Sequence, residues 1–174
     1  SFEVRDLLYS TINSIDYLIL LISNHQIKVY HGYNNTLIEI KIDGLPSNIE
    51  EIERDHSSKI GNFSDSKEIK ENTLDNYLKR IDRALTKELK EADVPVIVCG
   101  VKKTIGHFKK LTKNNKKILS YVEGNYDYAS KEEVYESIES SIIEKREQNQ
   151  NKVLDKLEKA ITKKNYVYGI ENVW

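Results

Sequence analysis

The stretch from Pro95 to Lys110 constrains the fold of this chain more than any other. Residues 95–100 form a short apolar run, rich in β-branched residues, that ends at a glycine. Such a run is typical of a strand that is buried on both faces. The residues that follow place Ile105 and Phe108 at helical spacing. The stretch therefore predicts a buried strand that leads directly into a helix.

The predicted helix is basic from its first turn, because Lys102 and Lys103 open it. Lysines at this end of a helix oppose the macrodipole, which favours anions there. They belong to a segment, residues 94–122, that holds seven lysines and no carboxylate. The seven lysines are Lys102, Lys103, Lys109, Lys110, Lys113, Lys116 and Lys117. Either these side chains are simply solvated, or an anionic partner binds them.

The charge of the whole chain does not indicate a nucleic-acid-binding protein, because the formal net charge is −1. An electrostatic signal must therefore come from how the charges are distributed. Acidic residues gather between Glu50 and Asp55 and again between Glu132 and Glu139, away from the lysine-rich segment. The sequence predicts one basic region and separate acidic ones.

Cysteine and histidine usage gives no indication of a metal or a cofactor. The single cysteine, Cys99, excludes an internal disulfide and a cysteine-only zinc site, and its place in the apolar run predicts a core residue. His107 has no ligand partner at a metal-binding spacing. The longest apolar run, residues 17–22, is far shorter than the ~20 residues of a membrane span. Since no signal peptide precedes it, we expect a cytoplasmic protein without a membrane partner.

The first part of the chain predicts a meander of three strands. Residues 1–13 have apolar positions closer to helical spacing, whereas residues 17–23 form an apolar strand. Residues 26–31 and 36–42 alternate apolar and polar side chains, as half-exposed strands do. The turn between them, residues 32–35, is rich in residues that tolerate positive φ.

A long segment without a clear pattern follows, from Asp43 to Asn72. It contains glycine, proline and several serines but few large apolar residues. A loop of this length is uncommon inside a compact domain, so we expect either a functional loop or a disordered insertion. Gly61 and Asn62 are its candidate functional residues.

The last part of the chain predicts two helices that flank further strands. Residues 74–92 carry one apolar stripe at helical spacing, and residues 117–123 supply a fifth strand. Ser130 and Glu133 form a capping box at the start of a helix that runs to about Thr162. Such a helix would extend ~50 Å, more than one small domain can cover, so we interpret it as a connector. The predicted organisation is an α/β domain over residues 1–130, a connector helix over residues 131–163, and the start of a following domain at residues 164–174, in a chain that we expect to be part of a longer polypeptide.

The order of these elements predicts an α/β fold: a ribonuclease-H-like, five-stranded mixed sheet with helices on both faces, followed by the long C-terminal helix. Nucleases of this fold hold divalent metals on carboxylates, one of which lies on the first strand. Here residues 17–22 carry no carboxylate and Asp16 precedes them. We therefore expect neither a metal site nor metal-dependent nuclease activity.

Several segments together resemble one protein family. They are residues 1–8, the strand pair at residues 17–30, residues 81–85, residues 95–101 and, as the most distinctive piece, residues 122–130. The resemblance is to the middle domain of the bacterial homologues of archaeal and eukaryotic peptide-chain release factors, which Pelota, a ribosome-rescue factor, also contains. It implies a ribosome-associated role, with ribosomal RNA or transfer RNA as the partner.

The chain departs from the family's release factors at the residues that carry catalysis. Their loop after the third strand bears a Gly-Gly-Gln tripeptide, whose glutamine helps to position the water that hydrolyses peptidyl-tRNA. The segment from Asp43 to Asn72 contains neither a glutamine nor paired glycines, and Gly61-Asn62 is the nearest remnant. The resemblance therefore implies a domain without catalytic residues, cofactor or small-molecule substrate.

Three interpretations of function remain. The first is a non-catalytic translation factor domain that binds RNA through the seven lysines, since lysine–phosphate contacts supply affinity independent of sequence. Tyr121, Tyr126 and Tyr128 could add base stacking, although tyrosines beside a turn often cover a sheet edge. The second is a peptidyl-tRNA hydrolase with an atypical loop. The third is a protein-interaction module that uses its long helix.

Overall fold

The computed structural model describes residues 14–23, 25–57 and 66–162. The helix predicted over residues 1–13 lies outside this part of the chain. The chain divides into two compact units, one formed by Asp16–Glu139 and the other by Ser1–Ile15 with Ser140–Trp174. The first unit contains the whole sheet and the helices that cover it.

The first three strands form the predicted meander. β1 (Asp16–Ile22) pairs antiparallel with β2 (Ile27–Tyr33), which pairs antiparallel with β3 (Thr36–Ile40). β2 thus runs two residues beyond its predicted end and β3 ends two residues early. In the turn between them Asn34 has a φ of 52°. This agrees with the prediction that the turn contains residues that tolerate a positive φ. The hydroxyl of Tyr17 donates a hydrogen bond to the Asn34 carbonyl at 2.9 Å, which ties this turn to the central strand.

Two parallel strands complete the sheet on the other side of β1. β4 (Val96–Gly100) pairs with β1, and β5 (Ile118–Glu123) pairs with β4. The strand order is β3-β2-β1-β4-β5, and only β2 runs against the others. This is the ribonuclease-H-like mixed sheet that the order of elements predicted. The apolar runs of β1 and β4 are buried on both faces because they occupy its centre.

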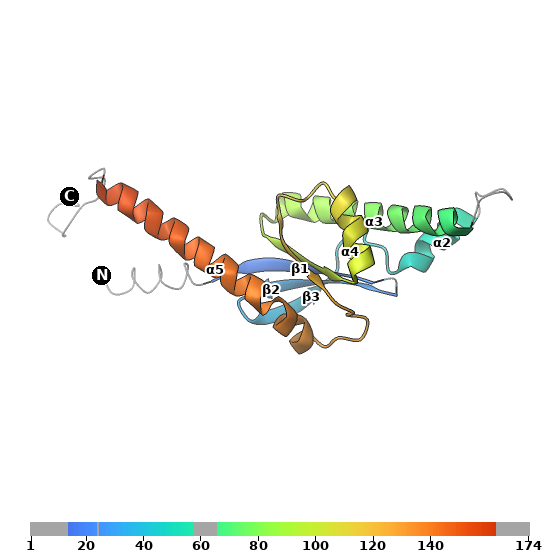
Figure 1. The fold of residues 1–174 in the computed structure, drawn as a ribbon, viewed down its shortest axis with the longest axis horizontal. Coiled ribbons are helices and arrows are strands. Elements are labelled where there is room, and N and C mark those ends of the chain that lie inside the picture. The colour runs from blue at the N-terminus through green and yellow to red at the C-terminus, as the bar shows by residue number, and fades with distance from the viewer. Residues whose placement is uncertain (1–13, 24, 58–65, 163–174) are drawn as a thin grey trace. The chain divides into compact units, whose positions relative to one another are not determined.

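One face of the sheet is covered by α3 (Ser66–Glu91) and α4 (Lys102–Leu111), which lie above it in Figure 1. The predicted apolar stripe of α3, including Tyr77, Leu78 and Ile81, joins the main core against β1 and β4. All three side chains are completely buried.

The prediction of a structureless segment from Asp43 to Asn72 was wrong for residues 49–57 and 66–72. α2 (Ile49–Ser57) forms within it, and α3 begins at Ser66 rather than Leu74. The Asn48 side chain accepts a hydrogen bond from the Glu51 amide at 3.1 Å, and the Glu51 carboxylate accepts one from Ser47. These bonds satisfy helix-end donors, so capping stabilises a helix that has few apolar residues to bury.

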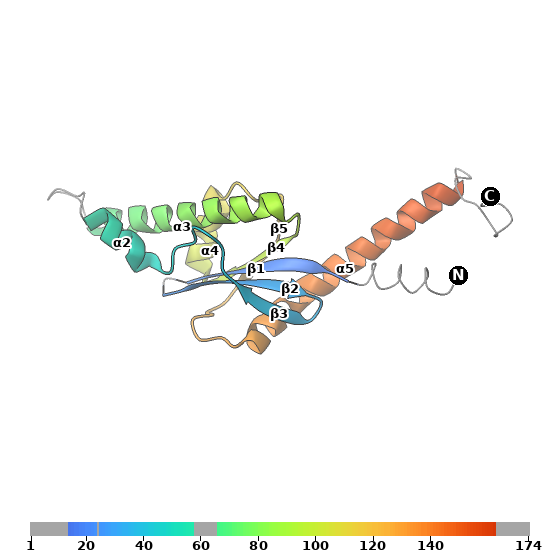
Figure 2. The same ribbon diagram turned by 180° about the vertical axis from the view of Figure 1, so that it is seen from behind.

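The opposite face of the sheet is covered by the first turns of α5 (Lys131–Thr162), as Figures 1 and 2 show. Val134 and Ile138 are completely buried there. The predicted capping box is present, since the Ser130 amide donates to Glu133 at 2.8 Å and the Glu133 amide donates to the Ser130 hydroxyl at 3.2 Å. The helix is unbroken over 32 residues, and its role as a connector stays a prediction.

Candidate nucleic-acid interface

The predicted strand-to-helix unit is present as β4 followed by α4. At the junction a Cβ on Gly100 would lie 2.7 Å from the Ile22 carbonyl oxygen, so glycine lets the two strands approach closely here. Val101 forms the N-cap of α4 in an extended conformation without a side-chain hydrogen bond. The first turn contains no acidic residue. The positive end of the α4 dipole is therefore not neutralised by an acidic side chain in its own first turn.

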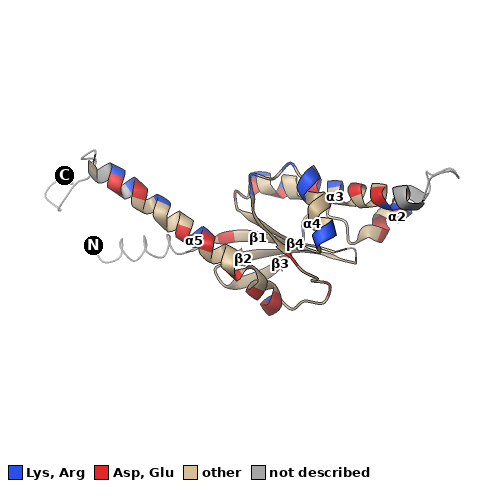
Figure 3. Cartoon of the chain, in the orientation of Figure 1, with Lys and Arg blue, Asp and Glu red and all other residues tan. Residues whose placement is uncertain are grey.

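The side chains of α4 divide into a buried and a basic face. Thr104, Ile105 and Phe108 are buried toward the sheet. Residues seven apart lie almost above one another on a helix, so Lys102 stands in line with Lys109, and Lys103 with Lys110. All four of these lysines are exposed, and Figure 3 shows them as blue segments at the two ends of α4.

A glycine lies at the centre of this basic face. At about 100° per residue, Gly106 points between the four lysines and away from the buried side chains. Nothing lies within 4 Å of the position that a Cβ would occupy. Because glycine destabilises a helix interior by roughly 0.5–1 kcal/mol relative to alanine, the fold itself gains nothing from it. The basic face is therefore flat at its centre.

The other three predicted lysines lie in the connection between α4 and β5. Lys113 and Lys116 are exposed, and Lys117 is half-buried and forms an ion pair with Asp93. Together with the four lysines of α4 they form what we call the lysine surface, which comprises Lys102, Lys103, Lys109, Lys110, Lys113, Lys116 and Lys117. The structure thus places all seven predicted residues on α4 and the loop that follows it.

A buried carboxylate holds this loop in place. Asp82 of α3 is only 6% exposed, and its carboxylate accepts hydrogen bonds from the Thr112 hydroxyl at 2.5 Å, the Lys113 amide at 3.2 Å and the Asn114 side chain at 2.9 Å. The Asn114 side chain also donates to the Thr86 hydroxyl at 2.8 Å. The loop is therefore anchored to α3 while Lys113 and Lys116 extend into solvent.

Sequence reasoning did not assign a role to Asp82. The available signal was its position, four residues after Leu78 and three before Leu85, which puts a carboxylate on the apolar stripe of the helix. A carboxylate on a buried face requires hydrogen-bond partners. The partners themselves are 30 or more residues away in the chain, so the pattern of α3 alone could not identify them.

The lysines differ in how far they are engaged within the protein. The Lys109 ammonium lies 4.6 Å from the centroid of the Tyr121 ring, in a cation–π contact. Within the described part of the chain, five of the seven take part in neither an ion pair nor a cation–π contact. These five are Lys102, Lys103, Lys110, Lys113 and Lys116.

Acidic side chains gather elsewhere, as predicted. Glu50 and Glu51 lie in the first turn of α2, and Glu132 and Glu133 in that of α5. Figure 3 shows these segments in red, apart from the blue segments of α4. Glu51 is partly neutralised by Arg80 at 2.9 Å. Lysines without interspersed carboxylates are therefore found on α4 and the following loop, whereas α3 and α5 mix basic and acidic residues.

The three candidate stacking tyrosines lie in different environments. Tyr121 contacts Lys109 and donates a hydrogen bond to Asn115 at 3.1 Å, and burial together with the Asp82 charge raises the pKa of its hydroxyl. Tyr126 is half-buried, and burial is the main cause of its raised pKa. Tyr128 is 97% exposed. Of these three, only Tyr128 presents a free ring.

Asn125 and Asp127 form a turn hydrogen bond, since the Asp127 amide donates to the Asn125 side chain at 3.1 Å. Asp127 does more than this. Its carboxylate accepts a hydrogen bond from the Ser23 hydroxyl, and its carbonyl accepts one from the Gln26 side chain. The distinctive segment at residues 122–130 is thus fastened to the end of β1 and the start of β2.

The remaining predicted residues do not assemble a catalytic group. Cys99 is completely buried, and burial raises the pKa of its thiol to about 12. His107 lies 3.6 Å from the Asp75 carboxylate, and Asp16 pairs with His31 at 2.8 Å. In the described ranges no cluster of three or more His, Cys, Asp or Glu side chains could hold a metal ion. Gly61 and Asn62, the functional-loop candidates, lie outside those ranges.

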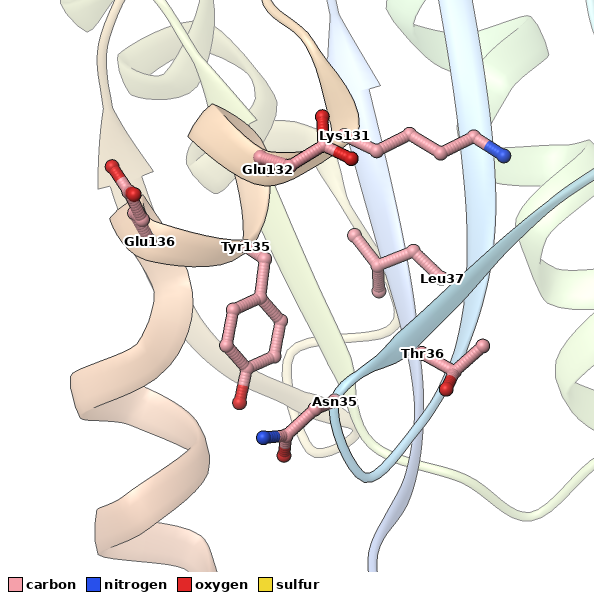
Figure 4. Close-up of a pocket in the computed structure, with 7 residues that line it drawn as sticks. All are labelled: Asn35, Thr36, Leu37, Lys131, Glu132, Tyr135 and Glu136. Atoms are coloured by element: carbon pink, nitrogen blue, oxygen red, sulfur yellow. The ribbon is translucent and has the colours of Figure 1, made fainter.

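A cavity of about 370 Å³ lies between the turn that joins β2 to β3 and the first turns of α5. It is lined by Asn35, Thr36, Leu37, Lys131, Glu132, Tyr135 and Glu136. Figure 4 shows that the charged groups do not converge on one point, because the Lys131 ammonium and the Glu136 carboxylate point to opposite sides. The cavity does not assemble a set of ligand-binding groups.

None of the described helices is both long enough and apolar enough to cross a membrane.

Similar solved structures include the Pelota protein of Thermoplasma acidophilum, with 15% identity and a TM-score of 0.46 over 99% of this chain and 50% of that one. Another is an archaeal protein, with 12% identity and a TM-score of 0.37 over 99% of this chain and 48% of that one. The chain thus spans about half the length of these proteins. No curated protein sequence matches it.

A family model gives the assignment. The model described as bacterial archaeo-eukaryotic release factor family 3 matches residues 16–174, which include every described strand and helix. The resemblance is therefore confirmed over residues 16–174, whereas its first segment, residues 1–8, lies outside the match. The chain belongs to family 3 of the bacterial archaeo-eukaryotic release factors.

Proposed function

We propose that this domain binds ribosomal or transfer RNA through the lysine surface and catalyses no reaction itself. Membership of a release factor family relates the chain to translation, where RNA is the most abundant anionic partner. The observation that carries the proposal is the exposed lysine surface, with four lysines aligned on α4 and no carboxylate between residues 94 and 122.

The physical chemistry of the surface favours a phosphate backbone. Lysine ammonium groups bind phosphates as point charges, and the affinity they supply is independent of base sequence. Gly106 lets a backbone approach α4 between two pairs of lysines, because no side chain stands there. The loop lysines Lys113 and Lys116 extend the same charge beyond the helix. Asp82 fixes this loop, so its lysines lose less freedom on binding.

The proposal that the domain is non-catalytic rests on the sequence of the segment that follows β3 and extends into the first turns of α3. Residues 43–72 contain no glutamine that could position a hydrolytic water as the Gly-Gly-Gln tripeptide does. We therefore propose that the domain contributes binding to the ribosome, while peptide release is not its reaction.

Cosedimentation with bacterial ribosomes tests this function. The purified protein should pellet with ribosomes, and changing Lys102, Lys103, Lys109 and Lys110 to Glu should leave it in the supernatant. A matched control changes four of the five lysines of α5, Lys145, Lys152, Lys156 and Lys159, to Glu, which alters the net charge equally. The control should pellet like the wild type, with circular dichroism verifying that both variants are folded.

Other outcomes would overturn the proposal. Equal cosedimentation of the wild type and the α4 variant would contradict the lysine surface as the binding site. Release of labelled peptide from ribosome complexes by the purified protein would instead favour a peptidyl-tRNA hydrolase. A stable complex with a non-ribosomal protein, without cosedimentation, would favour an interaction module.

A further inference from the structure

Tyr128 is the most exposed large apolar side chain in the described part of the protein. It is 97% exposed, whereas the next, Ile38 and Leu154, are 58% and 56% exposed. A ring that contacts almost nothing contributes no burial energy to folding. A large aromatic side chain in this position is therefore available for contact with another molecule.

The backbone that carries Tyr128 is held firmly on both sides. The preceding residue, Asp127, is bonded to Ser23 and Gln26 across the sheet edge and to Asn125 within the turn. The following residue, Ala129, donates its amide to the Tyr126 carbonyl at 3.4 Å. The ring thus projects from an anchored turn, so little backbone freedom is lost when something stacks on it.

Tyr128 lines two cavities, which differ in their charged residues. One, of about 350 Å³, is lined by His25, Gln26, Lys28, Asp127, Tyr128 and Ala129. The other, of about 340 Å³, contains Glu133 and no basic residue. Both volumes fall in the range of about 300–1,000 Å³ that is typical of small-ligand pockets. The first cavity suits a phosphorylated ligand better, because Lys28 lines it and the carboxylate of Asp127 already accepts a hydrogen bond from Ser23.

This cavity continues toward the lysine surface. A smaller cavity of about 80 Å³ shares His25 and Asp127 with it and extends to Val101. Val101 is the N-cap of α4 and directly precedes Lys102. A chain that occupies the Tyr128 cavity could therefore pass the carboxyl ends of β1 and β4 to reach the first lysines of α4.

We infer that Tyr128 stacks on a base of single-stranded RNA whose backbone runs from Lys28 to the lysine surface. The inference rests on the proposed function and deepens it, because it names the form of RNA that is bound. Stacking needs an exposed aromatic ring on the protein and the flat face of a base on the RNA. Because every base has such a face, Tyr128 can bind RNA without recognising its base sequence. Lys28 supplies a phosphate contact beside the ring, and the two cavities define the path between the sites.

The experiment measures binding of a fluorescently labelled, single-stranded RNA 12-mer to the purified protein. Stacking on an aromatic side chain is worth about 1–3 kcal/mol per base, so Tyr128→Ala should weaken binding about 5- to 150-fold. Tyr128→Phe should bind like the wild type, since stacking does not need the hydroxyl. The matched control, Tyr33→Ala, removes another exposed tyrosine and should leave binding unchanged.

The salt dependence distinguishes stacking from charge. Tyr128→Ala should keep the wild-type slope of log affinity against log salt concentration, whereas Lys28→Gln should reduce that slope by about 0.7. An oligonucleotide without bases should bind equally to the wild type and Tyr128→Ala.

Two results would overturn the inference while leaving the proposed function intact. The first is that Tyr128→Ala binds RNA with the wild-type affinity. The second is that Tyr128→Phe and Tyr128→Ala weaken RNA binding equally, which would indicate a hydrogen bond from the tyrosine hydroxyl in place of stacking. If the wild type binds neither RNA nor ribosomes, the proposed function fails and the stacking site fails with it. Binding of a protein partner that depends on Tyr128, without RNA binding, would likewise contradict the inference.

Discussion

The carboxylate of Asp82 in the middle of α3 accepts a 2.5 Å hydrogen bond from the hydroxyl of Thr112 at the end of α4. Both residues are 6% exposed. Thr112 also ends α4, because its amide bonds to the Phe108 carbonyl while its backbone turns to an extended conformation. This hydrogen bond therefore joins α3 to the residue at which α4 ends and the lysine-containing loop begins.

Replacing Asp82 should destabilise the protein and weaken RNA binding together. Asp82→Ala leaves three donors from the loop without their acceptor, and we expect a loss of about 2–4 kcal/mol in the free energy of unfolding. Asp82→Asn retains one acceptor oxygen and should fall between Asp82→Ala and the wild type. Urea unfolding measures this, with Arg83→Ala, an exposed neighbour on α3, as a control within about 0.5 kcal/mol of wild type.

Gly106 should be a site where substitution stabilises the fold. The position lies inside α4, and the space that a Cβ would occupy there is open, so Gly106→Ala should raise the free energy of unfolding by about 0.5–1 kcal/mol. Gly100→Ala is the contrasting variant, because its Cβ would be placed 2.7 Å from the Ile22 carbonyl. It should destabilise the protein. A destabilised Gly106→Ala variant would show that α4 packs on this face.

Cys99 should not react with thiol reagents in the folded protein. The thiolate is the reactive form, and burial both shields the sulfur and raises its pKa to about 12. Labelling by a disulfide reagent at pH 8 should therefore be slow in buffer and fast in denaturant. Rapid labelling under native conditions would contradict the position of β4 at the centre of the sheet.

The same buried thiol makes the stability depend on alkaline pH. The pKa of Cys99 rises from its ordinary value of 9.0 to about 12 on folding, so above pH 9 the unfolded chain loses a proton that the folded chain keeps. The contribution is complete below pH 9 and is lost as the pH rises toward 12. Since Tyr30 and Tyr77 also have raised pKa values, the wild type should be compared with Cys99→Ala, which should lose stability less steeply with pH.

The central elements of the fold could be predicted because their residues have one dominant role. β1 and β4 have continuous apolar sequences because both of their faces are buried. α3 has the apolar periodicity of a helix because one stripe of its side chains packs against these strands. α2 was missed because only Ile49 and Ile52 pack toward the core, too few to make a recognisable apolar stripe, while Asn48 and Glu51 cap its start. Capping groups are short-range signals that a search for apolar periodicity overlooks.

The candidate interface could be predicted only in part, for a related reason. The seven lysines all lie between positions 102 and 117, so their shared surface follows from one helix and one loop. The groups that position them are distant in the chain: Asp82 lies 30 residues before Thr112, and Ser23 lies 104 residues before Asp127. Sequence reasoning also could not separate Tyr128 from Tyr121, because only the fold shows that Tyr121 is already engaged with Lys109.

The salt dependence of RNA binding tests the central claim most directly. Log affinity should fall linearly with log salt concentration for the wild type, because each lysine–phosphate contact releases counterions. Changing Lys102, Lys103, Lys109 and Lys110 to Gln should reduce that slope by about 3, at roughly 0.7 per contact with single-stranded RNA. The same change at Lys145, Lys152, Lys156 and Lys159 should leave the slope unaltered. Equal slopes for the wild type and the α4 variant would contradict the lysine surface as the RNA-binding site.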